Sequence, residues 1–149
     1  MEIVQQTGID ERIVSFLKSQ TAVSICTCLD NVPYSCICFY AYSTEFNTLA
    51  FKSGENTLHI RQALSNPLVS GSVLPDKLEK TRVRGLQLLG RFFKPEGEIL
   101  SSLQRTYYKK YPIALTMKGD LWAIELSNIK LTDNTLGFGK KIIWKKEEN

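Results

Sequence analysis

The alternation of apolar and polar residues predicts a chain built mainly of short strands. Alternating or continuous apolar runs recur between clusters of turn-forming residues, and each run has the length of an ordinary strand. Between the first two runs, Asp30 and Asn31 are typical of a tight turn, so these runs form a hairpin. The expected strands cover residues 21–29, 34–42, 48–52, 68–74, 81–93, 121–131 and 140–144.

Three other segments follow helical spacing. In the first, Ile13 and Leu17 belong to one apolar stripe, and Thr7 with Asp10 resembles a capping box. Pro67 must end the second helix, because the residue before a proline is pushed out of helical space. The third carries acids in its first turn and lysines in its last, which suits the helix dipole. The expected helices cover residues 10–19, 57–64 and 96–110.

These elements predict the fold class. About seven short antiparallel strands with three helices indicate a mainly β (α+β) barrel or sandwich, formed by a single domain over residues 1–149. In the fifth strand, the alternation changes phase at Gly85, so we expect a bulge or bend at that residue.

Composition fits one ordinary globular domain. The chain has 149 residues, of which 43% are hydrophobic and 23% charged. No run approaches the roughly 20 apolar residues of a membrane span, and the first ten residues lack the basic-then-apolar order of a signal peptide. We therefore expect a cytoplasmic protein with no membrane segment.

The net charge of +4 is modest. Nucleic-acid binding is not expected, because such proteins show a stronger basic bias. In addition, Leu86 and Leu88 stand beside Arg82 and Arg84 in the alternation and interrupt a continuous basic face. A modest excess of positive charge fits a small anionic ligand as well as it fits nucleic acid.

Four cysteines form two C-x-C pairs, and both pairs fall on predicted strands. Structural zinc sites favour pairs spaced by two to four residues on turns, often with histidine. We therefore expect no metal site, and four reduced, buried cysteines that pack as small apolar side chains. The four are Cys26, Cys28, Cys36 and Cys38.

The segment 132–141, TDNTLGFGKK, joins the last two predicted strands. Its glycines permit close approach of the backbone to a ligand, and Lys140 and Lys141 place positive charge at its end. Backbone N–H groups and lysines of this kind can hold an anion. An ordinary glycine turn with solvated lysines is the alternative.

A second candidate lies at 52–59, KSGENTLH, where a strand ends and a helix begins. Free N–H groups at a helix start bind phosphate, and Ser53, Thr57 and His59 add polar side chains. The alternative is a simple helix cap. His59 is the only histidine, which excludes metal sites built from several histidines, and the residues suggest no acid–base constellation.

The order of helix, hairpin and strand, followed by FKSG, a short helix and NP, resembles the pyridoxamine 5′-phosphate oxidase-like split barrels. The segment TDNxxGFGKKxxW resembles the signature of a small uncharacterised bacterial branch of that superfamily. In this superfamily, flavin mononucleotide (FMN) commonly binds at a homodimer interface. The resemblance therefore implies a split barrel, FMN as cofactor and a homodimer.

The resemblance also implies the site residues. Lys52 and Ser53 fall where the third strand contacts the flavin, and Thr57 and His59 fall near the phosphate. The other implied contacts are Cys38, Phe39 and Tyr40 along the ring system, and Thr132, Asn134, Lys140 and Lys141 in the C-terminal segment.

This chain departs from the oxidase pattern at the phosphate. Leu58 replaces an arginine and His59 replaces a lysine, and the second strand lacks the oxidase's basic residues. The residues that bind pyridoxine phosphate cannot be mapped, so that reaction is not expected. Two functions stay open: an FMN-dependent oxidoreductase acting on an unknown small molecule, and a non-enzymatic module that binds flavin or another anionic cofactor as a sensor or carrier.

Overall fold

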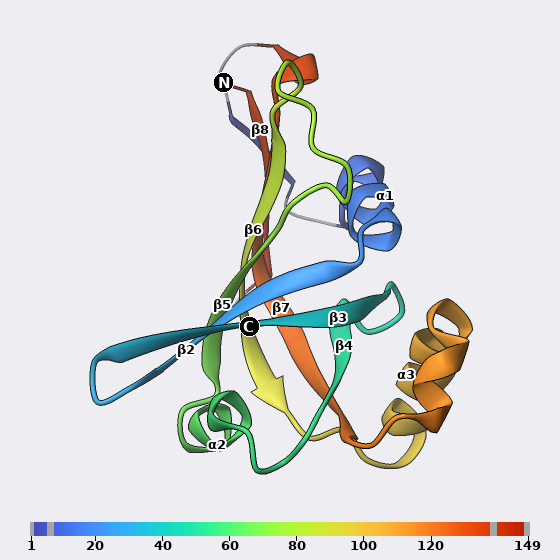
Figure 1. The fold of residues 1–149 in the computed structure, drawn as a ribbon. Coiled ribbons are helices and arrows are strands. Elements are labelled where there is room, and N and C mark those ends of the chain that lie inside the picture. The colour runs from blue at the N-terminus through green and yellow to red at the C-terminus, as the bar shows by residue number, and fades with distance from the viewer. Residues whose placement is uncertain (1, 6–7, 138–139, 148–149) are drawn as a thin grey trace.

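Eight strands form one sheet, most of which closes into a barrel (Figure 1). The computed structural model describes residues 2–5, 8–137 and 140–147. Neighbouring strands follow the order β1-β8-β7-β4-β3-β2-β5-β6, and β6 also pairs with β7, which closes a ring of six strands. The strands are β1 (Glu2–Gln5), β2 (Ala22–Leu29), β3 (Val32–Ser43), β4 (Thr48–Ser53), β5 (Leu68–Val73), β6 (Arg84–Phe93), β7 (Asp120–Asp133) and β8 (Lys141–Lys145).

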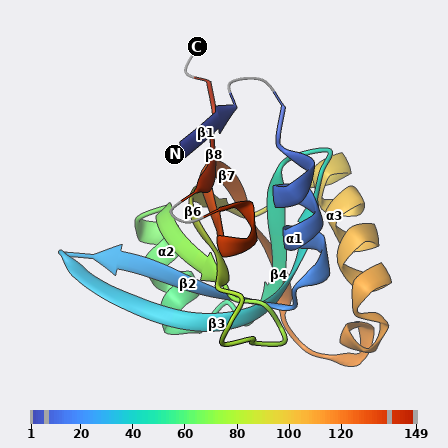
Figure 2. The same cartoon turned by 90° about the horizontal axis from the view of Figure 1, so that it is seen from above.

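Three α-helices surround the barrel, and Figure 2 shows α1 and α3 at one flank and α2 at the other. They are α1 (Glu11–Ser19), α2 (Leu58–Ser65) and α3 (Gly97–Lys110), with short 3-10 turns η1 (Pro112–Thr116) and η2 (Asn134–Leu136). Each predicted helix is present, with boundaries within about one residue of the expected ones. Among the described residues, no helix has the length and apolar character needed to cross a membrane.

Two apolar clusters hold these layers together. The larger fills the barrel and includes Tyr40, Phe51 and Trp122, with Ile13 and Leu17 of α1 packed against it. The smaller cluster lies between α3 and the outer side of the sheet, where Leu103 and Tyr107 meet small alanines of β3, β4 and β7. Both tryptophans, Trp122 and Trp144, are buried, as expected for core packing. The apolar stripes read from the sequence therefore point into these two layers.

The sequence prediction missed β1. This strand pairs in parallel with β8, from Glu2 opposite Lys141 to Gln5 opposite Trp144. Four residues carry too short an alternation to signal a strand by themselves, and the pairing is with the opposite end of the chain. The expected capping box is also revised: the side chain of Asp10 itself caps α1 by accepting a hydrogen bond from the N–H of Arg12. Thr7 lies outside the described residues.

The bulge or bend that the sequence predicted at Gly85 of β6 is not there, so this prediction was wrong. Gly85 pairs with Thr132 in continuous register, and the register shifts between Leu89 and Gly90 instead. A Cβ on Gly90 would stand 2.5 Å from Ile124 Cγ2 and 2.6 Å from the Glu125 carbonyl oxygen. Close approach of β7 therefore requires glycine at this position.

The hairpin of β2 and β3 matches the prediction. Asp30 and Asn31 form its turn with positive φ angles of 52° and 64°, the left-handed conformation that Asp and Asn tolerate. The register places Cys26 opposite Ser35, and Cys36 opposite Ile25. The two C-x-C pairs therefore face opposite sides of the sheet. All four cysteines are free thiols, but only Cys38 is buried, so the expectation that all are buried was wrong for the other three.

Candidate functional site

The loop between β4 and α2 brings Ser53, Thr57 and His59 together. Ser53 Oγ lies 2.7 Å from His59 Nε2, and Thr57 Oγ1 lies 3.4 Å from the same nitrogen. All three side chains are partly accessible to solvent. The loop therefore presents two hydroxyls and an imidazole in one small polar cluster.

Local hydrogen bonds shape this loop. The backbone N–H and the side-chain hydroxyl of Thr57 both donate to the carbonyl of Gly54, at 3.2 and 2.9 Å. Because the Thr57 hydroxyl is used in this way, no side chain caps the first N–H groups of α2, and the first turn carries no acid. The start of α2 can therefore accept an anion.

Trp122 fixes the position of this loop from inside the barrel. Its indole N–H donates to the carbonyl of Ser53 at 2.9 Å, and its ring is stacked with Phe92. Trp122 is 2% exposed. The backbone at the end of β4 is therefore tied to a rigid core residue, and no pattern in the sequence links Trp122 with the site.

Two cysteines of β3 face the same cluster. One potential metal-binding atom each from Cys36, Cys38 and His59 lies within 4.8 Å of the others. A hydrogen bond from the Cys38 thiol lowers the pKa of Cys36, whereas this bond and burial raise the pKa of Cys38. Burial lowers the pKa of His59, which keeps its imidazole neutral at pH 7. Sequence reasoning did not connect these cysteines with the histidine.

The predicted ring contacts on β3 do not share one face. Phe39 points outward and is 58% exposed, with its ring centroid 5.7 Å from that of Tyr111. Cys38 and Tyr40 point into the barrel, and the hydroxyl of Tyr40 donates to the carbonyl of Leu17 at 2.7 Å. Strand alternation makes this separation unavoidable. Of the three, only Phe39 offers an open side-chain surface.

Lys52 is separated from Ser53 by the same alternation. Its ammonium donates to the carbonyl of Ala114 at 2.6 Å and lies 5.2 Å from the ring centroid of Tyr108. This cation is therefore held on the outer side of the sheet, by η1 and α3, and not in the cluster formed by Ser53 and His59.

The C-terminal segment is anchored to the connection before β6. The N–H and side-chain amide of Asn134 donate to the carbonyls of Val83 and Thr81. Burial alone would raise the pKa of Asp133, but hydrogen bonds from Thr135 and the nearby Arg82 guanidinium lower it overall. These contacts give Asp133 and Asn134 a structural role. Phe138 and Gly139 lie outside the described residues.

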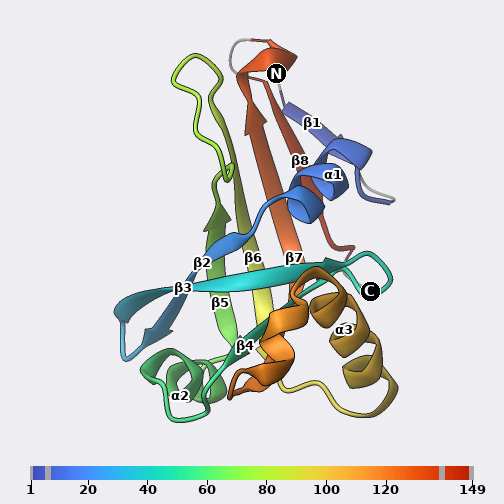
Figure 3. The ribbon, with the colours of Figure 1, turned by 45° about the vertical axis from the view of Figure 1, so that its right-hand side comes forward.

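The turn that joins β7 to β8, with Thr132 and Lys141 at its base, lies at the opposite end of β7 from the β4–α2 loop (Figure 3). Ser53 pairs with Asp120, where β7 begins, whereas Thr132 pairs with Lys141 near the end of β7. Twelve residues of strand span about 40 Å. Within one chain, Thr132, Asn134, Lys140 and Lys141 are therefore not brought together with Ser53 and His59.

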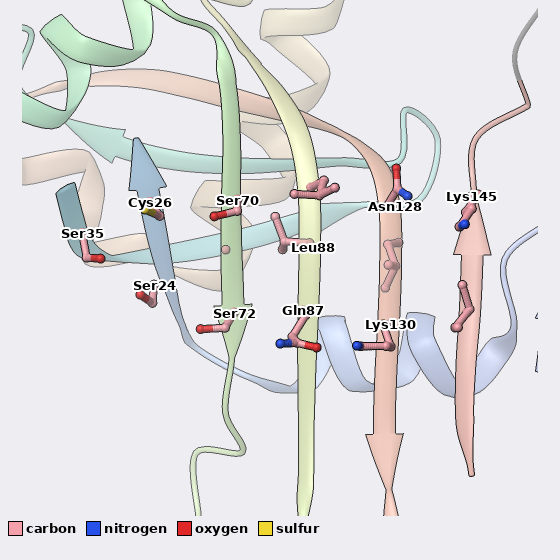
Figure 4. A pocket seen from close by; sticks show the side chains of 14 residues that line it. Ser24, Cys26, Ser35, Ser70, Ser72, Gln87, Leu88, Asn128, Lys130 and Lys145 are labelled. Atoms are coloured by element: carbon pink, nitrogen blue, oxygen red, sulfur yellow. The ribbon is translucent and has the colours of Figure 1, made fainter. Parts of the chain in front are cut away.

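A separate cavity of about 550 Å³ lies on the outer face of the sheet (Figure 4). Hydroxyl and amide groups from several strands line it, together with two lysines. They include Ser24, Ser35, Ser70, Ser72, Gln87, Asn128, Lys130 and Lys145. None of the predicted site residues lines this cavity. Its signal in the sequence was the row of polar residues at alternate positions of the strands, which is also typical of any solvated sheet face.

No family model matches this sequence. A UPF0306 protein of Photorhabdus laumondii is 30% identical over 131 residues, which cover 88% of this chain and 92% of that protein. The UPF0306 protein YhbP of Escherichia coli is 31% identical over 132 residues, covering 89% of this chain and 90% of that protein. These similarities extend over nearly the whole chain.

Solved structures share the fold at low sequence identity. A heme-binding protein from Mycobacterium smegmatis superposes with a TM-score of 0.74 at 14% identity over 87% of this chain, which spans about half (55%) of that protein. An FAD-binding protein from Mesorhizobium loti gives a TM-score of 0.68 at 18% identity, covering 84% of this chain and 94% of that one.

A third structure, a Listeria innocua protein named provisionally as a pyridoxamine 5′-phosphate oxidase, gives a TM-score of 0.63 at 16% identity. The match covers 81% of this chain and 95% of that one. At such identities, the likeness concerns the fold alone. It confirms the mainly β split barrel that the sequence predicted.

Proposed function

Because this chain belongs to the UPF0306 family and has the split-barrel fold, we propose that it binds flavin mononucleotide between two copies of itself. The proposal is supported by two fold relatives, one described as an FAD-binding protein and one provisionally as a pyridoxamine 5′-phosphate oxidase. The single observation that carries it is the polar cluster at the start of α2, where Ser53, Thr57 and His59 converge.

The cluster fits the phosphate of the cofactor. The first N–H groups of α2 have no side-chain cap, and the first turn has no acid that would compete with an anion. The Ser53 hydroxyl can donate to a phosphate oxygen, and the Thr57 hydroxyl can do so by turning from the Gly54 carbonyl to which it donates in the free chain. The phosphate is thus held mainly by neutral donors, which agrees with the absence of arginine and lysine at positions 58 and 59.

Phe39 supplies an aromatic surface for the ring system. It lies on β3, the strand beside β4, and its exposed ring already contacts Tyr111. An aromatic side chain that is 58% exposed offers a planar surface on which a second ring can stack. The ring system therefore lies on the outer side of β3, and the phosphate lies at the barrel end.

A second copy completes the site. Lys140 and Lys141 stand about 40 Å of strand away from Ser53, so they can reach the phosphate only from another chain. A two-fold dimer, the commonest symmetric assembly, uses the same surface twice and creates two equivalent sites. In this arrangement, Lys140 of the partner subunit supplies the positive charge that the β4–α2 loop lacks.

Bound flavin would supply hydride or electron transfer, so the protein need only bind, orient and shield it. On this proposal the chain is an FMN-dependent oxidoreductase acting on a small molecule, and no catalytic side chain of its own is required. A non-enzymatic flavin carrier is the second candidate, because it needs the same binding site and no further chemistry. Steady oxidation of NADH or NADPH by the flavin-loaded protein would distinguish the enzyme from the carrier.

Flavin titration tests the proposed cofactor. FMN fluorescence should be quenched by the wild-type protein, and Thr57→Ala should weaken binding by roughly tenfold, the value of one hydrogen bond to a charged group. Thr116→Ala is the matched control, because its hydroxyl makes a similar bond to a carbonyl three residues earlier, at 2.8 Å, in η1. Hemin titrated in parallel tests the other cofactor class found among the fold relatives. Binding of hemin without FMN would contradict the flavin proposal.

Mixed dimers test the shared site. Lys140→Ala and Thr57→Ala chains each give weakened sites as homodimers. After subunit exchange between them, about a quarter of all sites would regain both native residues if these residues come from different subunits. No recovery in dimers shown to have exchanged would place both residues in one chain and contradict the shared site.

A further inference from the structure

Cys36, Cys38 and His59 form a compact group of metal-binding side chains. Cys36 and Cys38 are two residues apart on β3 and share one face of the strand, directed to the barrel interior. His59 is in the first turn of α2, which packs against β2 and β3. The three potential ligand atoms lie within 4.8 Å of one another. Within the described residues, this is the only group of three or more such side chains that could hold an ion.

The other two cysteines are excluded from this group by the sheet. Cys26 is opposite Ser35 and Cys28 is opposite Pro33, so both side chains lie on the sheet face opposite to that of Cys36 and Cys38. A site built from all four cysteines is therefore impossible in this fold. The spacing of the cysteines in the sequence speaks against zinc, whereas the fold brings His59 beside one of the pairs.

We propose that Cys36, Cys38 and His59 bind a thiophilic divalent ion of the zinc class, leaving its fourth position open. Two thiolates and an imidazole are ligands that zinc prefers, and three protein ligands with an open position are typical of reactive zinc sites. With zinc–ligand distances of about 2.0–2.3 Å in a tetrahedron, ligand atoms stand roughly 3.5–3.8 Å apart. The group therefore needs to contract by no more than about 1.3 Å.

The surroundings suit a bound ion. Cys36 and His59 are partly exposed, so an ion can arrive from solvent, whereas Cys38 is buried and gives the site a fixed side. The Ser53 hydroxyl, 2.7 Å from His59 Nε2, orients the imidazole, as the hydrogen-bond partners of metal-bound histidines commonly do.

The metal inference does not rest on flavin binding. Two thiolates neutralise a divalent ion, so the loaded site adds no net charge for a phosphate. The two proposals share Ser53 and His59 but differ in their other residues. Flavin binding can be measured on chelator-treated protein, and metal binding can be measured on protein without flavin, so either proposal can fail while the other stands.

Cobalt(II) provides the direct test. Untagged, reduced, flavin-free protein titrated with Co²⁺ should bind one ion and develop the near-ultraviolet thiolate-to-cobalt band together with the intense visible bands of a tetrahedral site. Cys36→Ala and His59→Ala should each weaken binding at least tenfold. Cys28→Ala, which removes a cysteine of the opposite face, should leave both the bands and the affinity unchanged. Absence of the thiolate band in the wild type, or its persistence in Cys36→Ala, would overturn the proposal.

A second measurement uses only the wild-type chain and so does not depend on whether a variant folds. Zn²⁺ at one equivalent should slow alkylation of Cys36 and Cys38 at least tenfold, as mapped by mass spectrometry, and leave Cys26 and Cys28 as reactive as before. Equal protection of all four cysteines, or of none, would contradict the site.

Discussion

Ser53 Oγ and His59 Nε2 are 2.7 Å apart, and this contact joins the last residue of β4 to the first turn of α2. It closes the loop between strand and helix without using the first N–H groups of α2, which remain without a side-chain cap. His59 lies beside Cys36 and Cys38 of β3, and Ser53 is held through its carbonyl by the indole N–H of Trp122. A small polar centre is thus built on rigid elements.

Replacing Trp122 by phenylalanine should weaken FMN binding indirectly, through the position of the Ser53 backbone. The indole N–H that holds the Ser53 carbonyl is lost, at a cost of about 1 kcal/mol or roughly fivefold in affinity. Trp144→Phe is the control, because it removes a similar volume from the same core without touching the loop. Equal affinities of the two variants in a flavin titration would contradict the positioning role of Trp122.

Gly90→Ala should destabilise the fold, because its Cβ would meet Ile124 at 2.5 Å and the Glu125 carbonyl at 2.6 Å. Overpacking of this kind costs about 1–3 kcal/mol, which lowers the melting temperature by about 2–4 °C per kcal/mol in a chain of this size. Gly85→Ala is matched, since it lies in the same strand with its nearest neighbour at 3.9 Å. Thermal unfolding followed by circular dichroism compares them. A larger fall in melting temperature for Gly85→Ala than for Gly90→Ala would contradict the requirement for glycine at position 90.

Asp10→Asn should remove an acid-dependent part of the stability. The side-chain hydrogen bond from Arg12 lowers the pKa of Asp10 below its ordinary value of 3.8. Because this pKa is lower in the folded state, the Asp10 carboxylate stabilises the fold. The stabilisation is fully present above pH 3.8 and is lost as the pH falls through the folded-state pKa. Asparagine keeps the capping geometry but not the charge.

The Asp10→Asn variant should therefore be less stable than the wild type at pH 7 and approach it as the pH falls below 3.8. Urea unfolding across this range measures the difference. A gap that is independent of pH would show that the carboxylate charge has no part in it.

The strands and helices could be predicted because each carries its own alternation or cap. The turn at Asp30 and Asn31 and the end of α2 before Pro67 were read from local chemistry and are confirmed. Gly85 and Gly90 show the limit. Both glycines lie in β6, but only the approach of Ile124 on β7 decides which one is essential, and that contact joins residues far apart in the sequence.

In the candidate site too, contacts between residues close in the sequence could be predicted, whereas contacts between distant segments could not. Ser53, Thr57 and His59 are near one another in sequence, and a strand end followed by a helix start is enough to bring them together. The meeting of Cys36 with His59 depends on how α2 packs on β3, which no spacing in the sequence reveals. The separation of Lys140 from Ser53 depends on the length of β7, and the sequence showed only that both segments carry groups able to bind an anion.

The comparison of FMN with riboflavin tests the central claim most directly, because the two ligands differ only by the phosphate. If the start of α2 holds that phosphate, fluorescence titration of the chelator-treated wild-type protein should give at least tenfold tighter binding of FMN. Thr57→Ala should narrow this preference, and Lys146→Ala, a lysine paired with Glu125 on the surface, should leave it unchanged. Equal affinity of the wild type for FMN and riboflavin would contradict the phosphate site, and binding of neither would contradict the flavin function itself.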